Sequence, residues 1–197
     1  MKIQEISLSI FEVKSNTELF RMDNVEAGAG RSRWIRQGQG QQTRELHVLH
    51  VITDNGIEGV CTVGDARYTR MRTEDLEELR LLAIGEDPVD RVLLYSKCKA
   101  ATRGMFTLYG WHGVFDNCLW DIVAKSEGKS VSQLIGKKRE SCPAYYNFGG
   151  GSKEAAAQDT VKAVEMGFRA IKDHFRGTGP ENEPWFEAVR EAVGPDI

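Results

Sequence analysis

The sequence lacks the features that mark membrane, secreted and nucleic-acid-binding proteins. No run approaches the ~18 apolar residues of a membrane helix, and the first residues carry no apolar core like that of a signal peptide. The four cysteines form no CxxC pair and are too few in 197 residues for a disulfide framework. A formal net charge of −3 disfavours nucleic-acid and anionic-membrane partners. We therefore expect a reduced, soluble, cytoplasmic protein.

Several familiar catalytic and ligand-binding motifs are missing as well. The chain has no Gly-x-Ser-x-Gly elbow and no His/Cys/Asp/Glu cluster with metal-ligand spacing. His47 and His50 are three apart on an expected strand, hence on opposite faces, and we interpret both as structural. The glycines at 149–151 lack the spacing of a phosphate loop, so Ser152 is expected to cap a helix rather than help hold a phosphate.

The first third of the chain has the alternation of half-buried strands. Ile6, Leu8 and Ile10 alternate with serines, and two β-rich runs, 45–53 and 57–63, flank an Asn-Gly turn. This pattern predicts a three-stranded antiparallel meander. Between the first two runs, residues 21–44 are rich in Gly and Gln and are expected to form a long loop that is either functional or disordered.

The middle of the chain has helical periodicity. Thr73 is expected to cap a helix that presents leucines every three residues, and Pro88 is expected to open a second helix. The strongest pattern predicts a helix over 111–127, stopped by Gly128. The apolar residues assigned to the second helix are Val89, Val92, Leu93 and Tyr95.

From residue 143 onward, strand-like and helical runs alternate. The order is strand (143–148), helix (153–166), strand (168–174) and helix (184–193), which is typical of a parallel α/β array. Lys172 and His174 are two apart on the second strand and therefore share a face. Two neighbouring cations lower each other's pKa, so one of them can accept a proton at neutral pH. A solvated strand end is the alternative.

A basic segment with an aromatic residue lies at 31–36. Its arginines surround Trp34, and it has the chemistry to bind a carboxylate substrate. A solvated loop without a ligand is the alternative.

The order of these elements resembles the enolase superfamily, in its mandelate racemase and muconate lactonizing branch. The runs 114–125 and 128–136 are similar to the Ala-Leu-Trp-Asp helix and Leu-Leu-Gly turn that end the cap domain of that family. Residues 84–88 also fit the cap, and 167–172 resemble the second barrel strand. The implied fold is an α+β cap domain, made of the three-stranded meander plus helices, over 1–140. The first two β/α units of a TIM-type barrel follow over 141–197, a barrel that is incomplete in this chain.

The resemblance implies a metal-dependent enzyme that abstracts the α-proton of a carboxylate, as an acid-sugar dehydratase or a racemase. Lys172 and His174 match the Lys-x-Lys of barrel strand two, with histidine in place of the second lysine. The implied substrate-binding residues are Trp34, Arg36, Tyr68 and Asn147.

The resemblance also implies Mg²⁺ as the cofactor, a small carboxylate as the substrate and a homo-oligomer. In the family the metal ligands come from later barrel strands, and we expect none in these 197 residues, because a complete barrel needs about 250. The chain alone is then inactive. The alternative function is a non-catalytic cap or interaction module that needs a partner or the remaining barrel.

Overall fold

The computed structural model describes residues 1–24, 32–63, 71–101, 111–149, 152–173 and 179–197. At residues 15, 17–24, 32–37 and 44 it describes the backbone alone. The chain forms two compact units. The first unit comprises Met1–Thr17 and Gly40–Lys138, and the second comprises Glu18–Gln39 and Arg139–Ile197. The predicted division at residue 140 falls close to the later of these boundaries and stays a prediction.

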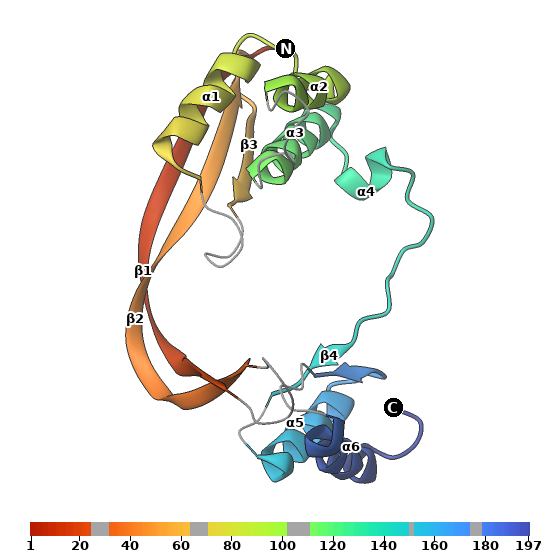
Figure 1. Ribbon diagram of the computed structural model, residues 1–197. Helices are drawn as coiled ribbons and strands as arrows, with labels where there is room; N and C mark the ends of the chain where they lie inside the picture. Colours follow the sequence, from red (N-terminus) through yellow and green to blue (C-terminus); the bar gives the residue numbers. More distant parts are fainter. Residues whose placement is uncertain (25–31, 64–70, 102–110, 150–151, 174–178) are drawn as a thin grey trace. The chain divides into compact units, whose positions relative to one another are not determined.

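The first unit is built on a three-stranded sheet in the order β1 (Ile3–Asn24), β2 (Ser32–Thr53) and β3 (Glu58–Thr62) (Figure 1). Strands β2 and β3 are antiparallel, with Val48 opposite Thr62 and Ile52 opposite Glu58. The turn that joins them is the predicted Asn-Gly turn. Gly56 has φ 79° there, and its N–H donates to the Thr53 carbonyl at 2.9 Å. The predicted meander is confirmed.

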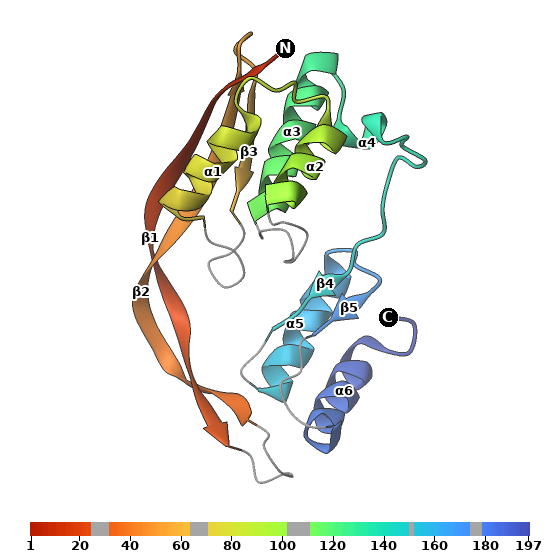
Figure 2. The same cartoon turned by 45° about the horizontal axis from the view of Figure 1, so that its top comes forward.

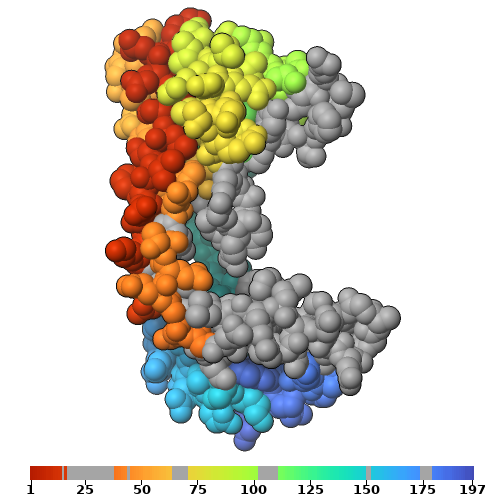
Figure 3. All heavy atoms as spheres, turned by 60° about the vertical axis from the view of Figure 1, so that its left-hand side comes forward, coloured from red at the N-terminus to blue at the C-terminus, as the bar shows by residue number. Residues whose placement is uncertain are grey.

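The three long helices of the first unit are α1 (Thr73–Ala83), α2 (Arg91–Ala101) and α3 (Trp111–Glu127). Helix α1 lies along β1, where the Arg80 guanidinium donates to the Ile6 carbonyl at 2.8 Å, and Figure 3 shows its yellow side chains beside the red strand. Helix α3 lies along β3 in both ribbon views (Figures 1 and 2). The core that these elements share comprises Ile3, Ile6, Leu49, Val51, Val63, Met71, Leu76, Leu79, Ala83, Leu94, Trp111, Val114, Phe115, Cys118, Leu119 and Ile122.

Helix α3 approaches β3 so closely that only glycine fits at one position. A Cβ atom on Gly59 would lie 2.1 Å from the Cys118 carbonyl oxygen and 2.8 Å from Cγ1 of Ile122. Polar contacts fix the same interface: Asp121 Oδ2 accepts from the Val60 N–H at 3.1 Å, and Lys125 Nζ donates to the Glu58 carbonyl at 2.6 Å. The helix predicted over 111–127 is confirmed, and Gly128 ends it with φ 61°.

An ion pair joins α2 to α3. The Arg91 guanidinium donates to both carboxylate oxygens of Asp116, at 2.8 and 2.7 Å. Its Cζ atom also lies 3.8 Å from the ring centroid of Trp120, in a cation–π contact. Asp116 and Trp120 belong to the run that resembles the superfamily, so these two residues hold the helices of the cap together.

The second unit contains two strand–helix pairs: β4 (Tyr146–Asn147), α5 (Lys153–Glu165), β5 (Ile171–Lys172) and α6 (Gly179–Val193). The two strands are parallel, which confirms the predicted start of a parallel α/β array. Ser152 caps α5 by accepting from the Ala155 N–H at 3.2 Å, as expected. The short helix α4 (Val131–Leu134), which belongs to the first unit, precedes this segment. None of the described helices is long and apolar enough to cross a membrane.

Some sequence expectations were wrong. The loop expected over 21–44 is strand at residues 21–24 and 32–44, because β1 and β2 extend far beyond β3 as paired strands. Thr73 is the first helical residue of α1, and the capping position is Arg72, whose N–H donates to Asp75 Oδ2 at 2.9 Å. Helix α2 begins at Arg91 rather than at Pro88.

The apolar face of α2 also differs from expectation. Helix α2 contributes Leu94 and Cys98 to the buried interior. Four apolar residues that the sequence assigned to this helix are exposed instead: Val89 (59%), Val92 (77%), Leu93 (40%) and Tyr95 (43%).

Candidate active site

The candidate site lies at the carboxyl ends of the two parallel strands. Asn147 ends β4, Lys172 ends β5, and the two residues are direct partners in the register. The Tyr146 N–H donates to the Ala170 carbonyl at 2.9 Å, and the Phe148 N–H donates to the Lys172 carbonyl at 3.1 Å. In parallel α/β sheets, ligands bind beyond the carboxyl ends of the strands. The pairing therefore brings an amide and an ammonium group together where such a ligand would sit.

The two faces of this strand pair differ in chemistry. Tyr146 and Ile171 pack with Phe148 against the helices, in a core that also contains Ala156 and Val189. Because side chains alternate along a strand, Asn147 and Lys172 lie on the opposite face. Asn147 is exposed and Lys172 is half-buried. The face away from the helices is the one that would line the interior of a barrel.

A carboxylate from α5 holds the segment that leaves β4. Asp159 Oδ2 accepts from the Gly149 N–H at 3.1 Å, and Oδ1 accepts from the Tyr146 hydroxyl at 3.3 Å. The negative charge of Asp159, with some burial and this hydrogen bond, raises the pKa of Tyr146 above its ordinary value. Asp159 thus holds the Tyr146 side chain before Asn147 and the Gly149 backbone after it.

Sequence reasoning missed Asp159, although a signal for it exists. Ala156, Thr160 and Ala163 are buried at helical spacing, so they mark the face of α5 that turns toward the strands. Asp159 is adjacent to this face, and a half-buried carboxylate there requires a donor nearby.

The remaining predicted site residues are only partly visible. Trp34 and Arg36 belong to β2, and the structure describes only their backbone atoms. Tyr68 and His174 lie outside the described residues altogether. Of the predicted set, the structure therefore brings Asn147 and Lys172 together, and the roles of all six residues stay predictions.

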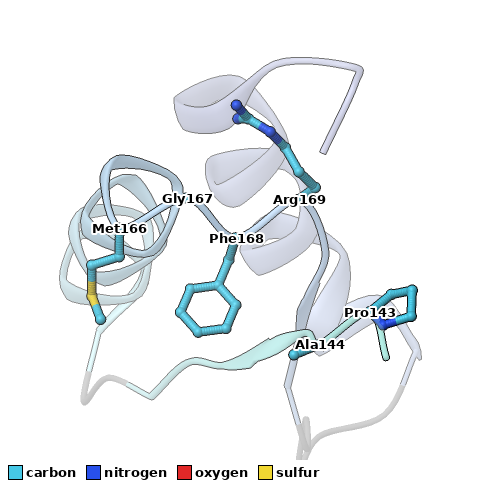
Figure 4. A pocket seen from close by; sticks show the side chains of 6 residues that line it. All are labelled: Pro143, Ala144, Met166, Gly167, Phe168 and Arg169. Carbon is cyan, nitrogen blue, oxygen red and sulfur yellow. The ribbon is translucent and has the colours of Figure 1, made fainter. Parts of the chain in front are cut away.

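An open pocket lies at the opposite end of the same strands. Pro143 and Ala144 line it before β4, and residues 166–169 line it before β5. Figure 4 shows the Phe168 ring between Met166 and Ala144, with the Arg169 side chain pointing away from them. Since this pocket is at the amino ends of the strands, it is not the place where an α/β sheet binds substrate.

The described residues do not fit a magnesium site. Within the ranges that the structure describes, no group of three His, Cys, Asp or Glu side chains is placed to hold a metal ion. Mg²⁺ requires several oxygen ligands in octahedral geometry. Asn147 and Lys172 supply one amide oxygen and a cation, so metal chemistry is not assigned to them.

Known proteins resemble the chain in both sequence and structure. A D-galactonate dehydratase family member, RspA, of Halomonas elongata is 32% identical over 136 residues, which are 66% of this chain and 33% of the relative. The arabinonate dehydratase of Saccharolobus solfataricus is 30% identical over 173 residues, which are 82% of this chain and 46% of the relative.

A solved structure of D-glucarate dehydratase from Agrobacterium tumefaciens, complexed with magnesium, superimposes with a TM-score of 0.77 and 26% identity. The match covers 100% of this chain and 52% of that one. The chain thus spans about half the length of this structure, and its alignments cover a third to a half of the two relatives.

The family model for the N-terminal domain of mandelate racemase and muconate lactonizing enzyme matches residues 37–136. These residues include most of β2, all of β3, helices α1 to α4 and the Asp116–Trp120 run. The match covers about half of the chain, and the solved dehydratase shares the fold of the whole of it. This chain belongs to the mandelate racemase/muconate lactonizing enzyme family.

Proposed function

We propose that this chain is the cap domain and the first two β/α units of an enzyme that removes the proton α to the carboxylate of an acid sugar. The observation that carries the proposal is the pairing of Asn147 with Lys172 at the carboxyl ends of β4 and β5. The dehydratases that resemble the chain support acid sugars as the substrate class. We further propose that the enzyme acts in the cytoplasm, as a homo-oligomer.

Each residue of the candidate site has a role in this reaction. The Lys172 ammonium would hold the substrate carboxylate, where charge grows as the α-proton leaves. The Asn147 amide would donate to a substrate oxygen and orient the sugar chain. A ring nitrogen of His174 would accept the proton as the C–H bond breaks.

The fate of the carbanionic intermediate decides between two reactions. In a dehydration, the hydroxyl on the neighbouring carbon leaves and takes up a proton as water. In a racemisation, a proton returns to the opposite face of the α-carbon. Trp34, Arg36 and Tyr68 are proposed to contact the rest of the substrate and so to select it.

We propose that the complete enzyme uses Mg²⁺, with ligands that the described residues do not provide. The ion would stabilise the negative charge of the intermediate. No role of Asn147 or Lys172 depends on contact with that ion.

The test uses the protein from the complete gene, incubated with arabinonate or galactonate in D₂O and magnesium, with exchange at the α-carbon followed by NMR. We expect exchange, and we expect Lys172→Ala and His174→Ala each to lower its rate by about 10²–10⁴. Lys153→Ala, an exposed lysine at the start of α5, is the matched control and should leave the rate unchanged. Absence of exchange with a broad panel of acid sugars would rule out the proposed activity.

The alternative, a non-catalytic interaction module, is favoured by one observation. Within the described residues, β4 and β5 pair only with each other, so each has an unpaired edge. A complete gene product that shows no exchange but binds a second protein through these strands would support the module. Exchange that depends on Lys172 would exclude it.

A further inference from the structure

We propose that Asp159, on α5, is a positioning residue that sets the orientation of the Asn147 amide in the candidate site. It does so through two residues that it contacts, Tyr146 and Gly149, which precede and follow Asn147 in the chain. This inference rests on the proposed function, in which the Asn147 amide donates to a substrate oxygen.

The carboxylate of Asp159 bridges the chain before and after Asn147. Its Oδ1 accepts from the Tyr146 hydroxyl at 3.3 Å, and its Oδ2 accepts from the Gly149 N–H at 3.1 Å. The same negative charge raises the pKa of Tyr146, so the hydroxyl keeps the proton that it donates. Each carboxylate oxygen has its own donor, and loss of the side chain would release both contacts at once.

Asp159 lies on the side of the strand pair that is turned away from the proposed ligand. Tyr146 packs with the small core between the strands and the helices. Because side chains alternate along a strand, Asn147 lies on the opposite face. Asp159 binds the Tyr146 hydroxyl from α5, hence from the side of the helices. We therefore infer that Asp159 acts on the reaction through Asn147 and does not touch the substrate.

This anchoring matters because β4 is short. The strand has two residues and ends at Asn147, which is exposed. Its ladder with β5 includes hydrogen bonds from the Tyr146 and Phe148 N–H groups. The contact between Asp159 and the Gly149 N–H extends this anchoring past the end of the strand. A displacement of about 1 Å in a reacting or binding group can slow a reaction about 10²-fold, so the segment must be held firmly.

The first test measures kcat and KM for α-proton exchange, using the complete gene product with arabinonate or galactonate and magnesium. We expect Asp159→Ala to lower kcat/KM by about 10–10²-fold. Asp159→Asn should restore most of it, because its amide oxygen can accept from the Gly149 N–H while its nitrogen donates to the Tyr146 oxygen. Glu165→Ala, which removes an exposed carboxylate from the same helix, is the matched control and should change nothing. A wild-type kcat/KM in Asp159→Ala would overturn the proposal.

A double-mutant cycle tests whether Asp159 acts through Asn147. In an Asn147→Ala background, Asp159→Ala should lower kcat/KM by less than about twofold, because the amide that it positions is gone. A merely structural role would lower kcat/KM equally in both backgrounds. Equal losses would therefore contradict the positioning role.

NMR of the 197-residue chain tests the positioning without any substrate. Asp159→Ala should accelerate amide hydrogen exchange at Gly149 about tenfold or more and shift the side-chain amide signals of Asn147. Glu165→Ala should do neither. Unchanged signals in Asp159→Ala would overturn the positioning role even if the enzyme is active. Lack of α-proton exchange in the wild type, with the expected NMR changes, would instead refute the proposed function.

Discussion

The two compact units of this chain differ in how much of their structure is internally supported. Among the described residues, the core of the first unit comprises sixteen buried residues from β1 to α3, whereas three buried residues form the second core. The first unit also fixes its helices with polar contacts such as the Arg91–Asp116 pair. In the second unit, α5 and α6 cover one face of β4 and β5, and the candidate site residues lie on the other. Among the described residues, the second unit therefore buries fewer residues within itself than the first.

The test with the largest expected effect is to remove a phenylalanine side chain from the core of each unit. Phe115 is fully buried in the first unit, and Phe148 is 5% exposed in the second. We expect Phe115→Ala to lower the free energy of unfolding by about 3–5 kcal/mol. Phe148→Ala should cost about 2 kcal/mol, because fewer neighbours surround it and the site can collapse.

The measurement is urea unfolding, combined with hydrogen exchange to assign each loss to a unit. Phe115→Ala should accelerate amide exchange in α1 to α3 and leave α5 and α6 unaffected. Equal losses that spread over both units would mean that the chain unfolds as one cooperative structure, and the comparison would fail.

How much the sequence predicts also differs between the two units. The helix over 111–127 was predictable because its apolar residues form a single wide face. The Asn55–Gly56 turn was predictable because such a turn needs a positive φ, which Gly56 adopts. The extent of β1 and β2 was not, since hydrogen bonds between their backbones extend the pair through glycine- and glutamine-rich residues. For α2, apolar residues occur on both sides, so periodicity alone could not select Leu94 as the buried one.

At the candidate site, the sequence placed Lys172 correctly on a strand beside a second strand, since the alternation of strand-like and helical runs follows the β/α spacing. Its pairing with Asn147 depends on register, which short strands do not specify. The role of Asp159 depends on contacts across 10 residues to the Gly149 N–H and across 13 to the Tyr146 hydroxyl. Such contacts become visible only when the helix is packed on the strands.

A second test concerns the close packing of α3 against β3 in the first unit. Gly59→Ala would place a methyl group 2.1 Å from the Cys118 carbonyl oxygen, so α3 must move away from β3. We expect a loss of about 3 kcal/mol, measured by thermal and urea unfolding. Gly113→Ala is the matched control, because nothing lies within 4 Å of the added methyl group. This variant should be stabilised by about 0.5–1 kcal/mol, since alanine favours the helix. Loss of stability in both variants would point to the glycine backbone rather than to the close approach.

The smallest expected effect is a loss of stability at low pH through Asp75, and it should also be confined to the first unit. Asp75 is 7% exposed at the start of α1. Its burial opposes ionisation, but hydrogen bonds from the backbone and side chain of Arg72, the charge of that guanidinium and a hydrogen bond from Trp111 together hold its pKa below the ordinary 3.8. The folded state therefore binds this proton less readily than the unfolded state does. The resulting stabilisation is complete above the unfolded pKa and is lost as the pH falls through the lower folded pKa.

Asp75→Asn should therefore cost about 1.5 kcal/mol at neutral pH, and this difference from the wild type should shrink as the pH falls from about 5 to about 2. Urea unfolding across that range measures it, with Asp196→Asn as the control, since Asp196 is exposed near the C-terminus. Hydrogen exchange should place the loss in α1 and its neighbours. A cost that stays constant with pH would mean that Asp75 acts through its shape and hydrogen bonds rather than its charge. The greater internal support of the first unit would then come from the size of its core alone, and not from charged side chains such as Asp75.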